Sequence, residues 1–237
     1  MKLTTRRAHL NAALGILVVL TIGFVIFLLS VIYIPSELTK NNIIKVAAIG
    51  DSITLGMGVE GEGTAGSYPT QLQALLGAKY QVANYGLGGR SLLSTGGLPY
   101  TQEDFYKQTQ ASNPNIVLIM LGTNDSGRKN WNAALYEKEL IQFVNVYKNL
   151  SSKPKVYLLT IPASGIKGDN AVADNVNGEI IKNEVVPIIM RVAKTTKTPI
   201  INIYAATKDH LNLFADGIHP NTEGYKIIAE TVYEAIK

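Results

Sequence analysis

The sequence predicts an α/β fold built on a parallel sheet, and two observations carry this prediction. Short runs of aliphatic and β-branched residues alternate with longer segments in which apolar residues recur at helical spacing, a pattern typical of repeated strand–helix units. The short runs are almost uniformly apolar, as expected for strands that helices cover on both faces. An apolar fraction of 46% in 237 residues is ample for one such core.

The expected elements follow one another in regular order. The strands are expected at 43–49, 80–85, 115–121, 155–161 and 199–204, and the helices at 68–76, 131–150, 176–193 and 221–236. Pro187 should kink or interrupt the third helix because proline has no amide hydrogen to donate. Either Asn221 or Thr222 can cap the last helix.

An uncharged apolar stretch, residues 11–34, precedes these elements. As a helix it would be about 36 Å long, which is enough to span a hydrocarbon core of about 30 Å. The alternative is a cleaved signal peptide, but the end of the stretch offers no small-residue cleavage site. We therefore expect residues 1–10 to be a basic flank, 11–34 a transmembrane signal anchor, 35–42 a linker and 43–237 the folded domain.

The charges predict which side of the membrane holds that domain. Lys2, Arg6 and Arg7 precede the anchor and give the N-terminal side an excess of cations, so the N-terminus should be cytoplasmic and the domain extracytoplasmic. Taking these three from the 22 cations leaves 19, against 18 acids, so the domain is nearly neutral. This balance gives no support for nucleic-acid binding, which requires clustered cations. The absence of cysteine excludes disulfides, thiolate metal sites and a cysteine nucleophile.

Polar motifs stand where the expected strands end. Ser52 follows the first strand, residues 86–90 follow the second, 122–125 follow the third, and Asp216 with His219 precede the last helix. Ligands of parallel sheets bind beyond the carboxyl ends of the strands. We therefore expect these segments to converge on one site.

The residue types in these motifs suit acyl transfer. A serine hydroxyl such as that of Ser52 becomes a nucleophile when a base takes its proton, and Asp216 and His219, three residues apart, supply an acid and a base. The backbone of Gly89, the carboxamide of Asn124 and the amide of Ser52 can donate hydrogen bonds to the oxyanion of a tetrahedral intermediate. Taken singly, the glycines could instead only turn the chain, and Asn124 could only cap a helix.

Other sites have weaker support in the sequence. Residues 56–61 match the dinucleotide pattern G-x-G-x-x-G, but they begin after the strand has ended and no acidic residue stands about 20 positions on. A metal site would rest on His210 and His219 with nearby aspartates, and His210 is better interpreted as an exposed loop residue. The segment around Ser52 lacks the second glycine of a G-x-S-x-G elbow.

Four blocks of the sequence resemble those of the SGNH or GDSL hydrolase superfamily, and they occur in the same order. They are GDSIT at 50–54, NYGLGG at 84–89, GTND at 122–125 and DGIHP at 216–220. The resemblance implies a flavodoxin-like three-layer α/β/α sandwich with a five-stranded parallel sheet, hydrolysis of esters or thioesters, and no metal or other cofactor. It implies a catalytic triad of Ser52, Asp216 and His219, with Ser52, Gly89 and Asn124 forming the oxyanion hole; Gly88 is the alternative to Gly89.

These observations together predict a membrane-anchored, extracytoplasmic serine esterase. The expected partners are the membrane and a small or polymer-borne ester, for instance an O-acetylated carbohydrate, a cell-wall polymer or a lysophospholipid. Two alternatives stay open, an O-acyltransferase that passes the acyl group to a sugar hydroxyl and a non-catalytic wall-binding module. Tyr68, Tyr85 and Tyr100 lie near the motifs, where they either stack on sugar rings or pack in the core. The oligomeric state and the acyl-chain length are not predicted.

Overall fold

The computed structural model describes residues 43–59, 65–127, 129, 131–165 and 176–237, together with Thr21 and Phe24. The chain divides into two units, Met1–Asn42 and Ile43–Lys237, and the second unit holds the fold described below. Apart from Thr21 and Phe24, the anchor expected at 11–34 lies outside the described residues and stays a prediction. Within the described ranges, no helix is both long enough and apolar enough to cross a membrane.

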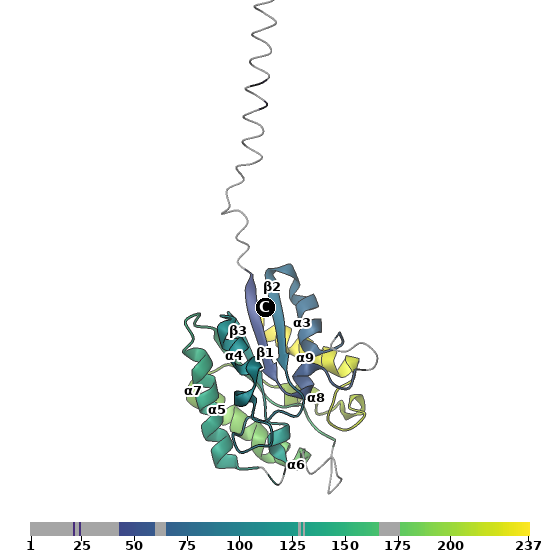
Figure 1. Ribbon diagram of the computed structural model, residues 1–237. Coiled ribbons are helices and arrows are strands. Elements are labelled where there is room, and N and C mark those ends of the chain that lie inside the picture. The colour runs from purple at the N-terminus through teal and green to yellow at the C-terminus, as the bar shows by residue number, and fades with distance from the viewer. Residues whose placement is uncertain are drawn as a thin grey trace, which may run out of the picture. The chain divides into compact units, whose positions relative to one another are not determined.

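The sheet is parallel and has five strands in the order β2-β1-β3-β4-β5 (Figure 1). The strands are β1 (Ile44–Gly50), β2 (Tyr80–Gly86), β3 (Ile116–Met120), β4 (Lys155–Leu159) and β5 (Ile200–Ile201). The first four agree with the expected strands to within two residues. The prediction of a strand over 199–204 is wrong beyond Ile201, because the Asn202 side chain accepts a hydrogen bond from the amide of Ala205 (3.0 Å) and starts a helix there.

Helices cover both faces of this sheet, and the expected three-layer sandwich is confirmed. They are α2 (Ser52–Leu55), α3 (Tyr68–Leu76), α4 (Asp104–Ala111), α5 (Ala133–Lys148), α6 (Gly178–Ile180), α7 (Val186–Thr196), α8 (Ile203–Thr207) and α9 (Thr222–Ile236). The pair α3 and α9 packs on one side of the sheet, with α8 beside α9, whereas α4, α5 and α7 lie on the other side (Figure 1). The short α2, α4 and α8 were not expected from the sequence.

The helix expected over 176–193 is divided in the described structure. A π-helical turn, Ile181–Val185, separates α6 from α7, and Pro187 stands in the first turn of α7. Proline has no amide hydrogen to donate, and the π-helical turn just before it changes the hydrogen-bonding pattern there, so the expected helix is interrupted at this point as the sequence predicted. At the start of α9 the cap is Asn221, whose side chain accepts a hydrogen bond from the amide of Gly224 (2.9 Å).

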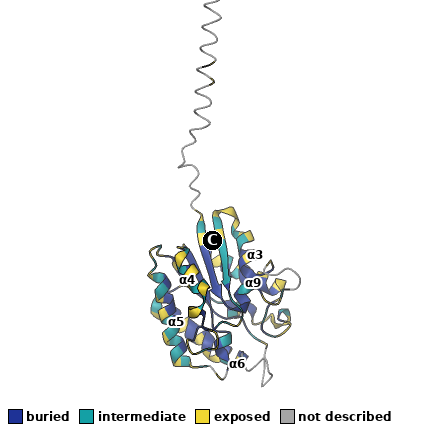
Figure 2. Cartoon of the chain, viewed as in Figure 1, coloured by how far each residue is buried: buried dark blue, intermediate teal, exposed yellow. Residues whose placement is uncertain are grey.

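The core lies between the sheet and its two helical layers. Every residue of β3 is buried, whereas the edge strand β2 is mostly half-exposed (Figure 2). Tyr68 and Tyr100 are fully buried, so these two rings pack in the core and are not available to stack on sugars. Tyr85 is half-buried and its ring meets that of Phe105 edge-on, with centroids 5.5 Å apart.

The strand order also locates the site. The order reverses between β1 and β3, and in sheets of this type ligands bind in the crevice beyond the carboxyl ends of the strands at that reversal. Ser52 directly follows β1 and Asn124 follows β3. Two of the predicted functional residues therefore flank the point at which a ligand crevice is expected.

Candidate active site

Ser52 lies on a sharp turn between a strand and a helix. Strand β1 ends at Gly50 and α2 begins at Ser52, with Asp51 between them accepting a hydrogen bond from the amide of Ile53 (2.9 Å) as the helix cap. The Ser52 amide is the first of the helix, and such an amide has no acceptor within its own helix. Ser52 is 5% exposed. The turn thus places an amide and a hydroxyl of the same residue at the strand end.

Strand β2 holds this turn in place. Asn84 donates from its carboxamide to the carbonyl oxygens of Thr54 (2.9 Å) and Leu55 (3.3 Å), and its oxygen accepts from the amide of Gly86 (2.9 Å). Gly86 permits this approach, because a Cβ atom there would lie 2.1 Å from the nitrogen of Leu55. The second sequence block therefore supports the helix that carries Ser52, a role that its glycines did not reveal.

The structure brings Ser52, His219 and Asp216 into one hydrogen-bonded array. His219 Nε2 lies 2.8 Å from Ser52 Oγ, and His219 Nδ1 lies 2.5 Å from Asp216 Oδ2. The distance between Ser52 and its base is within hydrogen-bond reach, as general-base activation requires. With Nδ1 protonated and donating to the carboxylate, Nε2 is free to accept the serine proton.

Asp216 orients His219 through the backbone as well as through the ring. Its Oδ1 accepts from the amides of Ile218 (2.9 Å) and His219 (2.7 Å). Gly217, which follows Asp216 directly, has a φ of 78°, in the left-handed region that glycine adopts readily. Partial burial raises the pKa of the Asp216 carboxyl, but the hydrogen bonds from His219 and Ile218 outweigh it and hold the pKa below its usual value. The carboxylate is therefore ionised at neutral pH.

Asn124 and Gly89 lie on two neighbouring loops that are bonded to each other. Asn124 donates one N–H of its carboxamide to the carbonyl oxygen of Arg90 (2.9 Å). A carboxamide has two N–H donors, so the second can serve an oxyanion. Gly89 precedes Arg90 and is exposed. The two predicted donors thus lie on two loops that are bonded to each other. The hydrogen bonds of these loops do not decide between Gly89 and Gly88 as the oxyanion donor, and Gly89 stays the prediction.

Asp125 ties the same two loops together, a role that was not expected from the sequence. Its Oδ2 accepts from the amide of Leu92 (3.0 Å) and its Oδ1 from that of Leu93 (2.7 Å). Burial raises the pKa of the Asp125 carboxyl to about 6, while the two amide donors oppose this rise. The only signal in the sequence was the position of Asp125 beside Asn124.

Two exposed apolar side chains flank residues 87–93, the loop after β2 that carries Gly89 and that we call the oxyanion loop. A Cβ atom on Gly88 would lie 3.4 Å from Met57 Sδ, and one on Gly89 would lie 3.6 Å from Leu98 Cδ1. Both backbones are held, because the Met57 carbonyl accepts from the Tyr225 hydroxyl (2.6 Å) and the Leu98 carbonyl from the Ser91 amide (3.0 Å). Exposed apolar side chains on a held backbone beside the predicted oxyanion donors are suited to contact the acyl part of a substrate.

His210, the other histidine of the domain, is exposed beyond α8. Among the residues that the structure describes, no group of three or more His, Cys, Asp or Glu side chains is arranged to hold a metal ion. Asp216 bonds to the ring of His219 as described above. The two-histidine metal site thus gains no support from the described residues.

Known proteins share both this sequence pattern and this fold. The sequence model of the GDSL-like Lipase/Acylhydrolase family matches residues 48–227. An acetylxylan esterase of Xylanibacter ruminicola is 35% identical over 217 residues, which are 84% of this chain and 44% of that protein. A multidomain esterase of Ruminococcus flavefaciens is 27% identical over 82% of this chain and 28% of its own length. The chain therefore spans less than half the length of these two relatives.

Solved structures of low sequence identity share the fold. A carbohydrate acetylesterase from Sinorhizobium meliloti superposes with a TM-score of 0.69 at 19% identity, covering 81% of this chain and 98% of that one. An aryl esterase from M. smegmatis, in its inhibitor-bound form, gives 0.70 at 18% identity over 81% of this chain and 98% of its own. A lipase/acylhydrolase from Enterococcus faecalis gives 0.63 at 24% identity, with 82% and 95% covered.

Proposed function

We propose that this chain, which belongs to the GDSL-like lipase/acylhydrolase family and is an ester hydrolase of that family, removes acetyl groups from acetylated carbohydrates with Ser52 as its nucleophile. The observation that carries the proposal is the hydrogen-bonded array of Ser52, His219 and Asp216. The substrate class is inferred from the acetylxylan esterase that is 35% identical to the chain.

In the first half of the proposed reaction, His219 Nε2 takes the proton of Ser52 as Oγ attacks the acetyl carbonyl carbon. The carbonyl oxygen becomes negative and is held by the amides of Ser52 and Gly89 and by the carboxamide of Asn124. Asp216 stabilises the protonated imidazole without taking its proton. The C–O bond to the sugar then breaks, and the sugar oxygen leaves with the proton from His219.

In the second half, water completes the hydrolysis. His219 accepts a proton from a water molecule while the water oxygen attacks the carbonyl carbon of the acetyl-enzyme. The same three donors hold the oxyanion of this second tetrahedral intermediate. Collapse expels Ser52 Oγ, which regains a proton from His219, and acetate leaves. The His219 side chain is 15% exposed and that of Asp216 is 52% exposed. Water can therefore reach the base, as hydrolysis of the acetyl-enzyme requires.

The proposed location follows from the sequence. We expect residues 11–34 to anchor the chain in the cell membrane and residues 43–237 to face the extracytoplasmic side, where acetylated polysaccharides are accessible. The support is the uncharged length of the segment and the three cations that precede it. Protease protection in intact cells tests this placement, because a domain on the cytoplasmic side would be protected.

The test of the activity is acetate release from acetylated xylan by the purified full chain. Ser52→Ala should lose activity by about 10⁶-fold, the effect typical of removing a triad nucleophile. The exposed Ser151 gives a matched control, since Ser151→Ala makes the same chemical change in the turn that precedes β4, at the opposite end of the parallel strands. Undiminished turnover in Ser52→Ala would disprove the assignment. Adding an unacetylated sugar and analysing the products distinguishes hydrolysis from acetyl transfer.

A further inference from the structure

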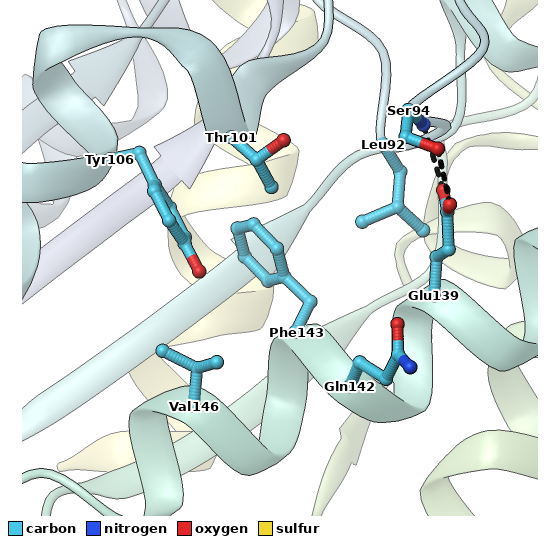
Figure 3. A pocket seen from close by; sticks show the side chains of 8 residues that line it. All are labelled: Leu92, Ser94, Thr101, Tyr106, Glu139, Gln142, Phe143 and Val146. Carbon is cyan, nitrogen blue, oxygen red and sulfur yellow. Dashed lines mark hydrogen bonds between the residues drawn. The ribbon is translucent and has the colours of Figure 1, made fainter.

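A pocket of about 300 Å³ lies between α4 and α5, beside the loop that follows β2 (Figure 3). We call it the α4–α5 pocket. Its walls come from Leu92 and Ser94 of that loop, from Thr101 and Tyr106, and from Glu139, Gln142, Phe143 and Val146 of α5. The volume is at the lower end of the range of about 300–1,000 Å³ for small-molecule sites. It suits one small ring better than an extended ligand.

The inner surface of the pocket is apolar and aromatic. The rings of Tyr106 and Phe143 have centroids 5.5 Å apart and planes inclined at 32°. Phe143 is buried, whereas Tyr106 is half-exposed, so Tyr106 offers the accessible ring and Phe143 backs it. A ligand with an apolar face can pack against such a surface.

The rim of the pocket is polar and rich in hydrogen-bonding capacity. Glu139 accepts from both the amide (2.8 Å) and the hydroxyl (2.5 Å) of Ser94, and each carboxylate oxygen keeps a further lone pair. Gln142 and Thr101 are exposed, and both can donate and accept hydrogen bonds. Figure 3 shows Thr101 above the two aromatic rings, with Gln142 and the bonded Ser94–Glu139 pair on the side of Phe143.

This combination selects a class of ligand. The lining residues include no lysine or arginine and include one carboxylate, so an anionic ligand such as a phosphate or a free carboxylate is disfavoured. A purely apolar chain would make no hydrogen bonds with the rim groups. A neutral ligand with several hydroxyl groups and an apolar C–H face matches both surfaces, and a sugar ring has this character.

The pocket is connected to the proposed catalytic site through the oxyanion loop. Leu92 is three residues beyond Gly89, so their Cα atoms lie within about 11 Å of each other, the reach of three extended residues. The Leu92 amide is also bonded to Asp125, next to Asn124. The pocket and the predicted oxyanion donor Gly89 thus share one short loop, along which an oligosaccharide would extend from the ester at Ser52.

We propose that the α4–α5 pocket is a subsite for a non-reacting sugar unit of the acetylated carbohydrate substrate. The proposal rests on the proposed function for its substrate class. It predicts that the enzyme prefers acetylated oligosaccharides to acetylated monosaccharides, because only an oligosaccharide fills the subsite while its ester lies at Ser52.

The kinetic test uses the full chain with Gln142→Ala, Thr101→Ala and the double variant. Acetylated xylo-oligosaccharides are compared with 4-nitrophenyl acetate, which carries no sugar unit to fill the pocket. We expect the ratio of KM for the oligosaccharide to KM for the nitrophenyl ester to rise about tenfold in the double variant, with kcat for the oligosaccharide retained. Asn145→Ala is the matched control, because Asn145 is an exposed carboxamide of α5 that does not line the pocket.

A binding measurement separates this proposal from the proposed function. Unacetylated xylo-oligosaccharides have no ester to cleave, and their binding is measured by titration calorimetry with the wild-type chain and the double variant. Binding that weakens about tenfold in the double variant supports the subsite even if acetylated sugars are not hydrolysed. An unchanged KM ratio, or no binding to the wild-type chain, overturns the proposal. Hydrolysis of nitrophenyl acetate without hydrolysis of any acetylated sugar would refute the proposed substrate class alone.

Discussion

Replacing Asp216 with asparagine should impair the enzyme more than replacing it with alanine. Asp216 Oδ1 accepts from two backbone amides, at 2.9 and 2.7 Å, and only an oxygen can keep those bonds. In Asp216→Asn the side-chain oxygen would therefore stay on the backbone, and the NH₂ group would face Nδ1 of His219. Nδ1 must then accept, so Nε2 carries the proton and cannot take one from Ser52.

The two substitutions should lower kcat by different factors, because Asp216→Ala removes the charge, whereas Asp216→Asn removes it and also changes the tautomer of His219. Asp216→Ala removes the charge that faces the imidazolium formed during the reaction, whose Nδ1 lies 2.5 Å from Oδ2. Two unit charges whose centres are about 4 Å apart attract by about 1 kcal/mol in water and about 4 kcal/mol near a protein surface. Since the Asp216 side chain is 52% exposed, Asp216→Ala should lower kcat by about 5- to 10³-fold. Asp216→Asn adds the wrong tautomer, and a loss of about 10⁴-fold is expected, as for the same change in a serine protease.

The assay is the steady-state hydrolysis of 4-nitrophenyl acetate by the two variants and the wild-type chain at neutral pH. Thermal unfolding of the same samples checks that each variant is folded, because Asp216→Ala also removes the acceptor of two backbone amides. If the asparagine variant retains as much activity as the alanine variant or more, then the tautomer argument fails. If both retain wild-type activity, Asp216 has no part in the reaction.

Four further predictions concern the two loops that carry the predicted oxyanion donors and the apolar side chain beside them. Asn124→Ala should lower kcat by about 10²- to 10³-fold, as the loss of one oxyanion donor typically does, and stopped-flow acylation kinetics check this. In Asp125→Asn the NH₂ group would face the buried amide of Leu92 or Leu93 in place of an oxygen acceptor. The free energy of unfolding should therefore fall by about 1–3 kcal/mol, and thermal unfolding experiments measure this. The pKa of Asp125, raised by burial to about 6, lies above its unfolded value of about 3.9, so wild-type stability should fall as pH rises from about 4 to about 6, a slope that Asp125→Asn should lack. Leu98→Ala should raise kcat/KM for butyryl relative to acetyl esters by about tenfold, because a methylene in a binding pocket is worth about 1–3 kcal/mol; an unchanged ratio in an ester series would exclude Leu98 from acyl selection.

The sequence predicted the architecture because the buried strands leave a simple signal. Uniformly apolar runs such as Ile116–Met120 are typical of strands that are covered on both faces. The four glycine-containing blocks then indicated the family, and the match over residues 48–227 confirms it. The three residues expected to form the triad meet within hydrogen-bonding distance.

Short elements were harder to predict because their cause is local. Helix α8 replaces the end of the expected last strand when the side chain of Asn202 caps it. Helix α4, at Asp104–Ala111, has few apolar residues, since it contributes mainly the rings of Phe105 and Tyr106 to the core. Neither a single cap nor two rings produce a periodic pattern that can be distinguished from a loop.

The roles of the supporting residues could not be read from the sequence, because each depends on a contact between distant segments. Asn84 fastens the helix of Ser52 from another strand, and Asp125 holds the amides of Leu92 and Leu93 across 33 and 32 positions of the chain. Both stand inside blocks whose other residues touch the reacting atoms in the proposed mechanism. These positions of a block therefore hold a segment that overlaps or closely follows a neighbouring block.

This arrangement has a consequence for how a substrate influences the reaction. Asn124 is bonded to the carbonyl of Arg90, and the adjacent Asp125 is bonded to the amide of Leu92, so the two loops that carry the predicted oxyanion donors form one hydrogen-bonded unit. Leu92 also lines the α4–α5 pocket. A sugar that packs there contacts the same unit, whose hydrogen bonds already hold the loop of Gly89 in place. Filling the subsite should therefore raise the affinity for substrate and leave the alignment of the oxyanion donors, and with it kcat, unchanged.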